Sequence, residues 1–466
     1  MNIMELVQVF GHNFFFYVVV FLIVLSVLVF VHEWGHYIVA RLCRVRVDSF
    51  SIGFGKELFG WTDQKGTRWK VSMVPLGGYV KLFGDVDPAS AGHTDQIEDG
   101  EEGESRPMTE DERKEAFFAK PVAQRAAIVF AGPAINYIFA FLIYAAVFMY
   151  YGQSVSPPIA AAVGVGTAAE KYGFQPQDRI VSIDGKVMES FNDVRREMLL
   201  ALDVERHFVV ERNGEKQDIF AKPDREEMTD NFGFKSSQGR LGIYDPSRGV
   251  DVSKITKVEG EEIKDRDVLI KALQDRMDTT YKMEVDLGPF KEELIVHPIA
   301  EMNKNMTNKG DEIYYNVLFL SSHTSREVIQ LGPGEAVYRA ARECYLVTRG
   351  ILEGLGQMIT GVRSATELGG IIRIGAITGE MAQHGMLVLI GLVALLSINL
   401  GFINLLPIPL LDGGHLLFYA LEAIMGRPVS EQVQEYAFRF GLVFLIGIMA
   451  FANLNDLIQI LRVGSG

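Results

Sequence analysis

The chain has 466 residues, of which 48% are hydrophobic, and a formal net charge of −14. This length and apolar content favour a membrane protein with additional soluble parts over one compact soluble domain. The acidic balance, with no long basic block to offset it, argues against a nucleic-acid partner. The two cysteines, Cys43 and Cys344, are too few for a disulfide framework, and neither has a second cysteine at zinc-finger spacing.

The first predicted element is a membrane-spanning helix over residues 14–42. The residues before it include Glu5 and no Lys or Arg, and the apolar run is too long for the core of a signal peptide, so we expect it to stay in the mature protein. Basic residues follow it directly, which by the positive-inside rule puts the N-terminus outside and the end of this span in the cytoplasm. These residues are Arg41, Arg44 and Arg46.

The motif HEWGH occupies residues 32–36, near the end of this helix. Residues four apart share a helix face, so the imidazoles of His32 and His36 can point at one ion. Zinc accepts such a pair, together with a third protein ligand and an open position for water. Glu33 is rotated off the ligand axis, where it could take a proton from a metal-activated water. A capping or packing role is disfavoured because these polar groups are costly inside a membrane.

Residues 59–85 alternate apolar and polar side chains and are broken by Gly77-Gly78, which is typical of short strands and turns. We predict a membrane-associated β-loop whose edge could pair with an extended peptide, with Gly77 and Gly78 as substrate contacts. A plain cytoplasmic hairpin is the alternative. The acidic run DQIEDGEEGE, residues 95–104, predicts a solvated loop.

A second span is predicted over residues 126–151, and an outside region follows it. The stretch 173–199 shows a turn, a short apolar strand, Asp-Gly and a helix in the order of a PDZ core. A weaker echo at 252–273 predicts a second module of the same kind. Such modules bind peptides by strand addition or could act as a size filter over the entrance. Residues 335–362 mix Arg and Glu with an apolar stripe, as a helix along the membrane would, and we expect amphipathic connecting helices over 331–384.

The third span ends in SINLGFINLLPIPLLDGGH. Pro407 and Pro409 cannot donate to the helical ladder and so open the backbone near the cytoplasmic boundary. With a fourth span over 441–458, the first and third spans end on the same side, which brings Asp412 to the depth of the two histidines. Asp412 can be the third ligand; His415 is an alternative ligand, and an ordinary Asp-Gly turn is the alternative reading of the stretch.

Four features together resemble the site-2 proteases, which are intramembrane zinc metalloproteases: HEWGH, AGPAIN in the second span, LLDGG in the third, and the external PDZ-like insertion. The resemblance implies zinc ligation by His32, His36 and Asp412 and catalysis by Glu33. It also implies substrate contact from asparagines of the third span, Asn404 and Asn399. An interhelical hydrogen bond is the alternative role for Asn404.

The expected fold class is an α-helical polytopic membrane protein with four transmembrane helices, a membrane-associated β-loop and inserted extracytoplasmic PDZ-like α+β domains. The predicted segments, in chain order, are the first span with its cytoplasmic end (1–58), the β-loop (59–85), an acidic cytoplasmic loop (86–125) and the second span (126–151). They continue with a first PDZ-like domain (152–230), a second (231–330), connecting helices (331–384), the third span (385–412), and the fourth span with the C-terminus (413–466).

The expected function is that of a zinc endopeptidase in the bacterial inner membrane, with its PDZ-like domains in the periplasm. The resemblance implies single-span membrane proteins as substrates in the lipid bilayer, among them an anti-sigma factor of envelope-stress signalling and signal-peptide remnants. The alternative from another class is a membrane-anchored PDZ scaffold with an inactive metal site. The intact set of His32, Glu33, His36 and Asp412 disfavours it, because a scaffold needs none of them in lipid.

Overall fold

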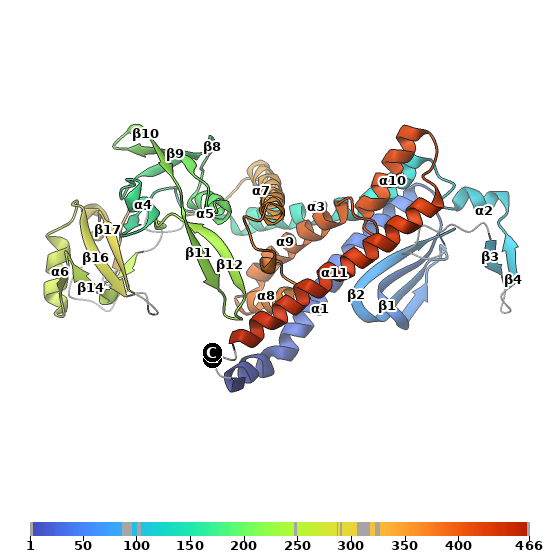
Figure 1. Cartoon of the computed structure of the whole chain (residues 1–466), viewed down its shortest axis with the longest axis horizontal. Helices are drawn as coiled ribbons and strands as arrows, with labels where there is room; N and C mark the ends of the chain where they lie inside the picture. The colour runs from blue at the N-terminus through green and yellow to red at the C-terminus, as the bar shows by residue number, and fades with distance from the viewer. Residues whose placement is uncertain are drawn as a thin grey trace.

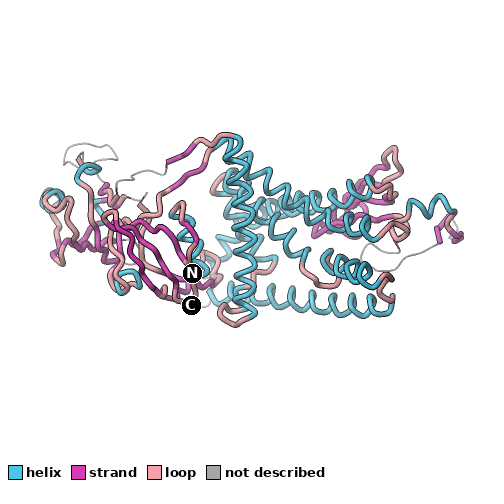
Figure 2. The backbone as a smooth tube through the Cα atoms, turned by 90° about the horizontal axis from the view of Figure 1, so that it is seen from above, coloured by secondary structure: helices cyan, strands magenta, loops and turns pink. Residues whose placement is uncertain are grey.

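The computed structural model describes residues 3–85, 96–99, 104–246, 249–286, 288, 291–304, 317–321 and 327–463. A group of long helices forms the middle of the molecule, with a β-hairpin at one end and two sheet modules at the other (Figure 1). The start of α1 and the end of α11 both lie on the side of the sheet modules (Figures 1 and 2).

Four helices among the described residues are long and apolar enough to cross a membrane, in agreement with the predicted spans. They are α1 (Ile3–Leu42), α3 (Val122–Tyr151), α9 (Met386–Leu405) and α11 (Glu431–Val463). The fourth extends well beyond the predicted 441–458, because polar residues continue the helix past its apolar core. A shorter helix, α10 (Asp412–Met425), precedes it.

Small residues bring α1, α3 and α9 close together. A side chain at Gly35 of α1 would overlap the backbone of Ala131 in α3, and one at Gly401 of α9 would lie 2.9 Å from the carbonyl oxygen of Pro133. Close backbone approach at small residues is the usual way in which helices pack within a bilayer. Because α3 contacts both α1 and α9, it can present groups to the end of α1 that carries HEWGH.

The predicted β-loop is the second half of a longer hairpin. Its strands β1 (Val47–Thr62) and β2 (Arg68–Leu82) are antiparallel, with several bulges. The hairpin exposes many large apolar side chains, as a surface in contact with lipid would. These are Phe54, Leu58, Phe59, Trp61, Val71, Met73 and Val74.

The acidic run after this hairpin, predicted as a loop, lies partly in paired strands. They are β3 (Gln96–Asp99) and β4 (Glu104–Pro107), which pair with each other. The rest of the run, at 95 and 100–103, lies outside the described residues. A short helix, α2 (Glu110–Glu115), leads into the second span and starts with a capping box at Thr109.

The two sheet modules share one order of elements: strand, tight turn, strand, helix, and two more strands. The first has β7 (Arg179–Ile183), β8 (Lys186–Val187), α5 (Phe191–Leu200), β9 (Arg206–Arg212) and β10 (Glu215–Ala221). The second has β14 (Ile255–Val258), β15 (Glu261–Glu262), α6 (Arg266–Gln274), β16 (Tyr281–Asp286) and β17 (Lys291–Val296). The tight turns match as well, because Asp184-Gly185 and Glu259-Gly260 all have positive φ. The structure therefore contains the repeat that the sequence echo predicts.

A short strand joins the two modules into one unit. β6 (Ala162–Gly164) precedes the first module in the chain but pairs with β17 of the second. Its successive side chains serve both cores, since Ala162 packs in the core of the second module and Val163 in that of the first.

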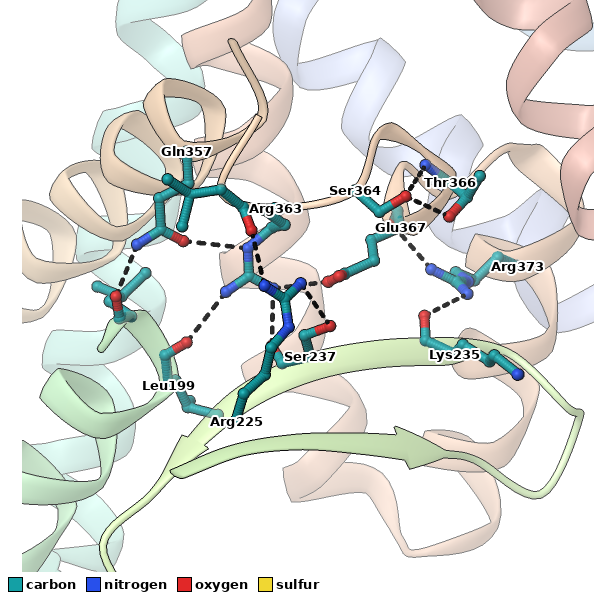
Figure 3. Close-up of polar contacts among 12 residues, drawn as sticks. Leu199, Arg225, Lys235, Ser237, Gln357, Arg363, Ser364, Thr366, Glu367 and Arg373 are labelled. Carbon is teal, nitrogen blue, oxygen red and sulfur yellow. Dashed lines mark hydrogen bonds and ion pairs between the residues drawn. The ribbon is translucent and has the colours of Figure 1, made fainter. Parts of the chain in front are cut away.

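The modules are held to the helices by a hairpin and by α7 (Pro333–Ile359). The hairpin consists of β11 (Asp224–Thr229) and β12 (Lys235–Arg240), and its tip packs Phe232 and Phe234 against Tyr17 of α1 and Ala376 of α8 (Ile371–Gln383). Arg363, just after α7, donates to the carbonyl oxygens of Leu199 and Ser237 at 3.0 Å each (Figure 3). Charged contacts between α5 and α7, such as Arg349 to Glu197 at 2.9 Å, add to this attachment.

Candidate metal centre

Two histidines one helical turn apart form the base of the site. His32 and His36 lie on α1, and their Nε2 atoms are 3.3 Å apart. His32 is only 8% exposed, so its ring is removed from solvent. The predicted shared face is therefore present, with both Nε2 atoms turned toward the same space.

Asp412 completes the group as the first residue of α10. Its Oδ2 atom lies 3.1 Å from His32 Nε2 and 3.6 Å from His36 Nε2. That oxygen is buried and has no partner in hydrogen-bond geometry. A buried carboxylate oxygen that faces two ring nitrogens in this way is suited to share a cation with them.

The spacing of the three atoms fits zinc. Ligand atoms at about 2.0 to 2.1 Å from a tetrahedral zinc ion are about 3.3 Å apart. The three distances here, from 3.1 to 3.6 Å, bracket that value. Among the described residues these side chains also form a group of the composition that holds metal ions in proteins. The residues present therefore fit the predicted zinc cofactor.

The loop before Asp412 is strained and tightly packed. Leu410 has a φ of +87°, a conformation that costs a leucine on the order of 1–3 kcal/mol. Gly413 and Gly414 follow, and any side chain on them would overlap the backbone of residues 405–409. The two prolines end α9 at Leu405, as their missing donors require, and this turn places Asp412 against the histidines.

The motif AGPAIN on α3 packs against the two histidine rings. A side chain at Gly132 would overlap the ring of His36 and lie 2.9 Å from Cε1 of His32. Nδ1 of His36 is 2.9 Å from the carbonyl oxygen of Ile128, to which it can donate. The side chain of Asn136 is 3.1 Å from Nδ1 of His32. The sequence had given no role to Gly132 or Asn136, although their spacing of four repeats that of the histidines.

A cavity of about 850 Å³ surrounds this group and extends to the turn between α10 and α11. Glu33, Asn404 and His415 line it, as do Gly77 and Gly78 of the β-hairpin, whereas Asn399 is not among the lining residues. The ring of His415 is tilted against that of Phe438 of α11, with ring centroids 4.9 Å apart. The structure thus gathers the predicted residues other than Asn399 in one cavity, with Asp412 rather than His415 beside the histidines.

Two contacts position groups beside the candidate ligands. Glu33 is half-buried and accepts a hydrogen bond from the backbone of Val80 in β2, and a side chain at Gly78 would lie 3.1 Å from its Cγ. On the other side, Nδ2 of Asn404 is 3.5 Å from Nε2 of His32. The hairpin and α9 therefore flank the space in which a substrate would meet the metal.

A protein with four candidate membrane-spanning helices and a His-Glu-x-x-His pair beside a third candidate ligand in one cavity has the design of an intramembrane metalloprotease. Comparison with known proteins agrees: the family model "Peptidase family M50" matches residues 20–448. The chain belongs to this family, that of the site-2 proteases, which confirms the resemblance seen in its motifs and the expectation that it is a metalloprotease.

Relatives match over nearly the whole chain. A protein of Agrobacterium fabrum that is named for zinc metalloprotease activity is 37% identical over 441 residues, 95% of each chain. The metalloprotease MmpA of Caulobacter vibrioides is 31% identical and covers 96% of each chain. The regulator of sigma-E protease RseP of Escherichia coli is 31% identical over 94% of this chain and 97% of its own. Together with the four apolar helices, this similarity supports an inner-membrane protein with a zinc cofactor.

Proposed function

We propose that the chain is a zinc endopeptidase that cuts the transmembrane segments of single-span membrane proteins, with Glu33 as its catalytic base. His32, His36 and Asp412 would hold the metal. The observation that carries the proposal is that their three ligand atoms converge within 3.1 to 3.6 Å of one another in a cavity that Glu33 also lines.

The side chains divide the chemistry among them. When bound, zinc supplies Lewis-acid activation of water and of the peptide carbonyl. Glu33 takes the proton of the attacking water and delivers it to the leaving nitrogen, so it must be able to accept and release one proton. Glu33 and Val80 both line the cavity, so the proposed base lies beside β2. Asn404, beside His32, is placed to donate its amide hydrogens to the substrate backbone.

A helical substrate hides its carbonyl groups and must become extended before attack. Residues 78–82 of β2 pair only with β1 among the described residues, so the other edge of this part of the strand is open to such a segment. Gly77 and Gly78 lie in β2 and line the cavity, which brings this strand to the candidate metal site. Unwinding is then the costly step, and Gly or Pro in the substrate lowers its cost.

The same architecture supports a role in regulated intramembrane proteolysis. The positive-inside rule places the N-terminus and the sheet modules in the periplasm. The modules would be PDZ-like domains that filter substrates by size or bind their termini by strand addition. Similarity to the regulator of sigma-E protease favours an anti-sigma factor of envelope-stress signalling as the substrate, and signal-peptide remnants share its single-span form.

The experiment uses purified full-length protein and a single-span model substrate. Glu33→Gln should keep the metal and abolish cleavage, because an amide cannot accept the proton of water. His36→Ala should lose both metal and cleavage, while Glu57→Gln, on the outer part of the hairpin, should lose neither. Cleavage by Glu33→Gln at the wild-type rate would disprove the assigned role.

The substrate proposal has its own test. A Gly- or Pro-containing transmembrane segment should be cut faster than an all-Leu version of the same length, in detergent and in membranes. Changing the residues that flank the cut for others of similar size should matter less. Equal rates for the two helices would rule out unwinding as the determinant of substrate choice.

A further inference from the structure

A buried asparagine of α3 contacts Nδ1 of His32, one of the candidate metal ligands. Asn136 is fully buried, and its Nδ2 atom is 3.1 Å from Nδ1 of His32. Its other side-chain atom, Oδ1, is also buried and has no hydrogen-bond partner. Buried polar atoms in folded proteins are nearly always paired, so the orientation of this amide calls for an explanation.

The state of His32 in a metal-bound protein supplies one. A neutral imidazole that offers Nε2 to a metal carries its proton on Nδ1, and that N–H needs an acceptor. Nδ2 of Asn136 is itself a donor and cannot fill this role. The oxygen and nitrogen of an asparagine are assigned from the hydrogen bonds around them, and the amide can be turned by 180° without moving any other atom. In the turned orientation Oδ1 accepts from Nδ1 of His32, and Nδ2 takes the position that the unpaired oxygen held.

The second ligand is held in the same manner. Nδ1 of His36 lies 2.9 Å from the carbonyl oxygen of Ile128, two turns before Asn136 on the same helix. The helix α3 therefore offers an acceptor to each ring. The two acceptors differ in kind, because a substitution at Ile128 leaves its backbone carbonyl in place, whereas a substitution at Asn136 can remove its side-chain oxygen.

Asn136 is itself fixed by α9. The hydroxyl of Ser397 donates to the backbone carbonyl of Asn136 at 2.9 Å, and Gly401 allows α9 to approach its Cβ closely. These contacts hold the backbone and Cβ of Asn136 in place beside the ring. An acceptor that is fully buried and held from behind in this way fixes both the tautomer and the angle of the ring it contacts.

We propose that Asn136 is a positioning residue that accepts the Nδ1 proton of His32 and thereby orients Nε2 toward the metal. This inference rests on the proposed function, since it takes His32 as a zinc ligand. The alternative is that Asn136 only fills space between α1, α3 and α9. The two roles predict opposite outcomes for two variants of nearly equal size.

Asn136→Leu keeps the volume but removes the acceptor, so its zinc affinity should fall roughly 10- to 100-fold, as is usual when such a partner of a ligand is lost. Asn136→Asp keeps an acceptor oxygen at the same position, so it should bind zinc as the wild type does. A residue that only fills space would tolerate Leu and reject a buried carboxylate. Asn455→Leu is the matched control, because it makes the same change in α11, where the amide donates to the backbone carbonyl of Thr366 and contacts no candidate ligand.

Zinc affinity is measured by competition with a chelator on purified full-length protein, and the absorption spectrum of the cobalt-substituted protein reports the ligand set. The expected result is weak binding and an altered spectrum for Asn136→Leu alone. Wild-type affinity in a folded Asn136→Leu protein, or loss of zinc by a folded Asn136→Asp protein, would overturn the inference. If the Leu variant does not fold, zinc binding by the Asp variant still tests the inference. A wild-type protein that binds no zinc would instead refute the proposed function.

Discussion

Gly132 gives the strictest test of how closely α3 supports the histidines. Replacing it by alanine adds one methyl group, which in a helix normally stabilises by about 1 kcal/mol. Here the added carbon would overlap the ring of His36 and lie 2.9 Å from Cε1 of His32. Two carbons in contact prefer a separation of about 3.5 to 4.0 Å, so the rings or the helix must move by at least about 0.6 Å.

A displacement of this size is large for a metal site. Metal–ligand distances are held within about 0.2 Å, so rings moved by about 0.6 Å cannot keep both bonds at their normal length. We expect Gly132→Ala to weaken zinc binding by at least about 100-fold, equivalent to about 2.8 kcal/mol, and to slow cleavage accordingly. The helix content of the protein should not fall.

The assay compares zinc affinity, cleavage and circular dichroism for two glycine variants. Gly391→Ala is the control, because it also adds a methyl group to a membrane-spanning helix, and nothing lies within 4 Å of the added carbon. It should bind zinc and cut substrate as the wild type does. A Gly132→Ala protein with wild-type zinc affinity would show that α3 does not confine the rings.

Three further predictions concern residues outside the metal site. Asp456 is fully buried and accepts hydrogen bonds from the backbone nitrogens of Gly370 at 2.8 Å and Arg373 at 3.0 Å. Its Oδ1 atom also lies 3.9 Å from Nε of Arg373, in a largely buried ion pair. Asp456→Ala should therefore lower the free energy of unfolding in detergent by about 3–5 kcal/mol, the usual cost of breaking a buried ion pair. Glu435→Ala, at an exposed position, should leave it unchanged, and equal values for the two variants would contradict the role of Asp456. Burial, and then the charge of Glu343, raise the pKa of Cys344 to about 11. Because the thiolate is the reactive form, alkylation of a Cys43→Ser protein should rise about tenfold per pH unit from pH 7 to 9, without a plateau. A plateau in the rate near pH 9 would contradict the raised pKa. In the proposed orientation, a membrane-impermeant reagent should reach Cys344 from outside the cell and should not reach Cys43 of a Cys344→Ser protein.

Local spacing was enough to predict the parts of the site that depend on one helix or one turn. The separation of His32 and His36 by four residues defines a shared face in any α-helix. The two prolines before Asp412 favour the end of a helix, and the number of spans predicted that this end lies on the same side as the end of the first span. Each of these inferences needed only backbone geometry and the direction of the chain.

The supporting residues could not be predicted in this way, because their roles depend on how separate helices are placed. Nothing near Gly132 or Asn136 in the sequence reveals that α3 crosses α1 at the histidines. The helix α10 was also missed, since its apolar residues follow the Asp-Gly pair and are hard to distinguish from the next span. The sharing of β6 between two modules depends on the pairing of strands far apart in the chain.

The order in which the ligands are synthesised has a consequence for the cell. His32, Glu33 and His36 enter the membrane with the first span, whereas Asp412 follows the third. During most of its synthesis the nascent chain therefore has an incomplete candidate metal site. In the proposed mechanism it cannot cleave another membrane helix before Asp412 has been synthesised.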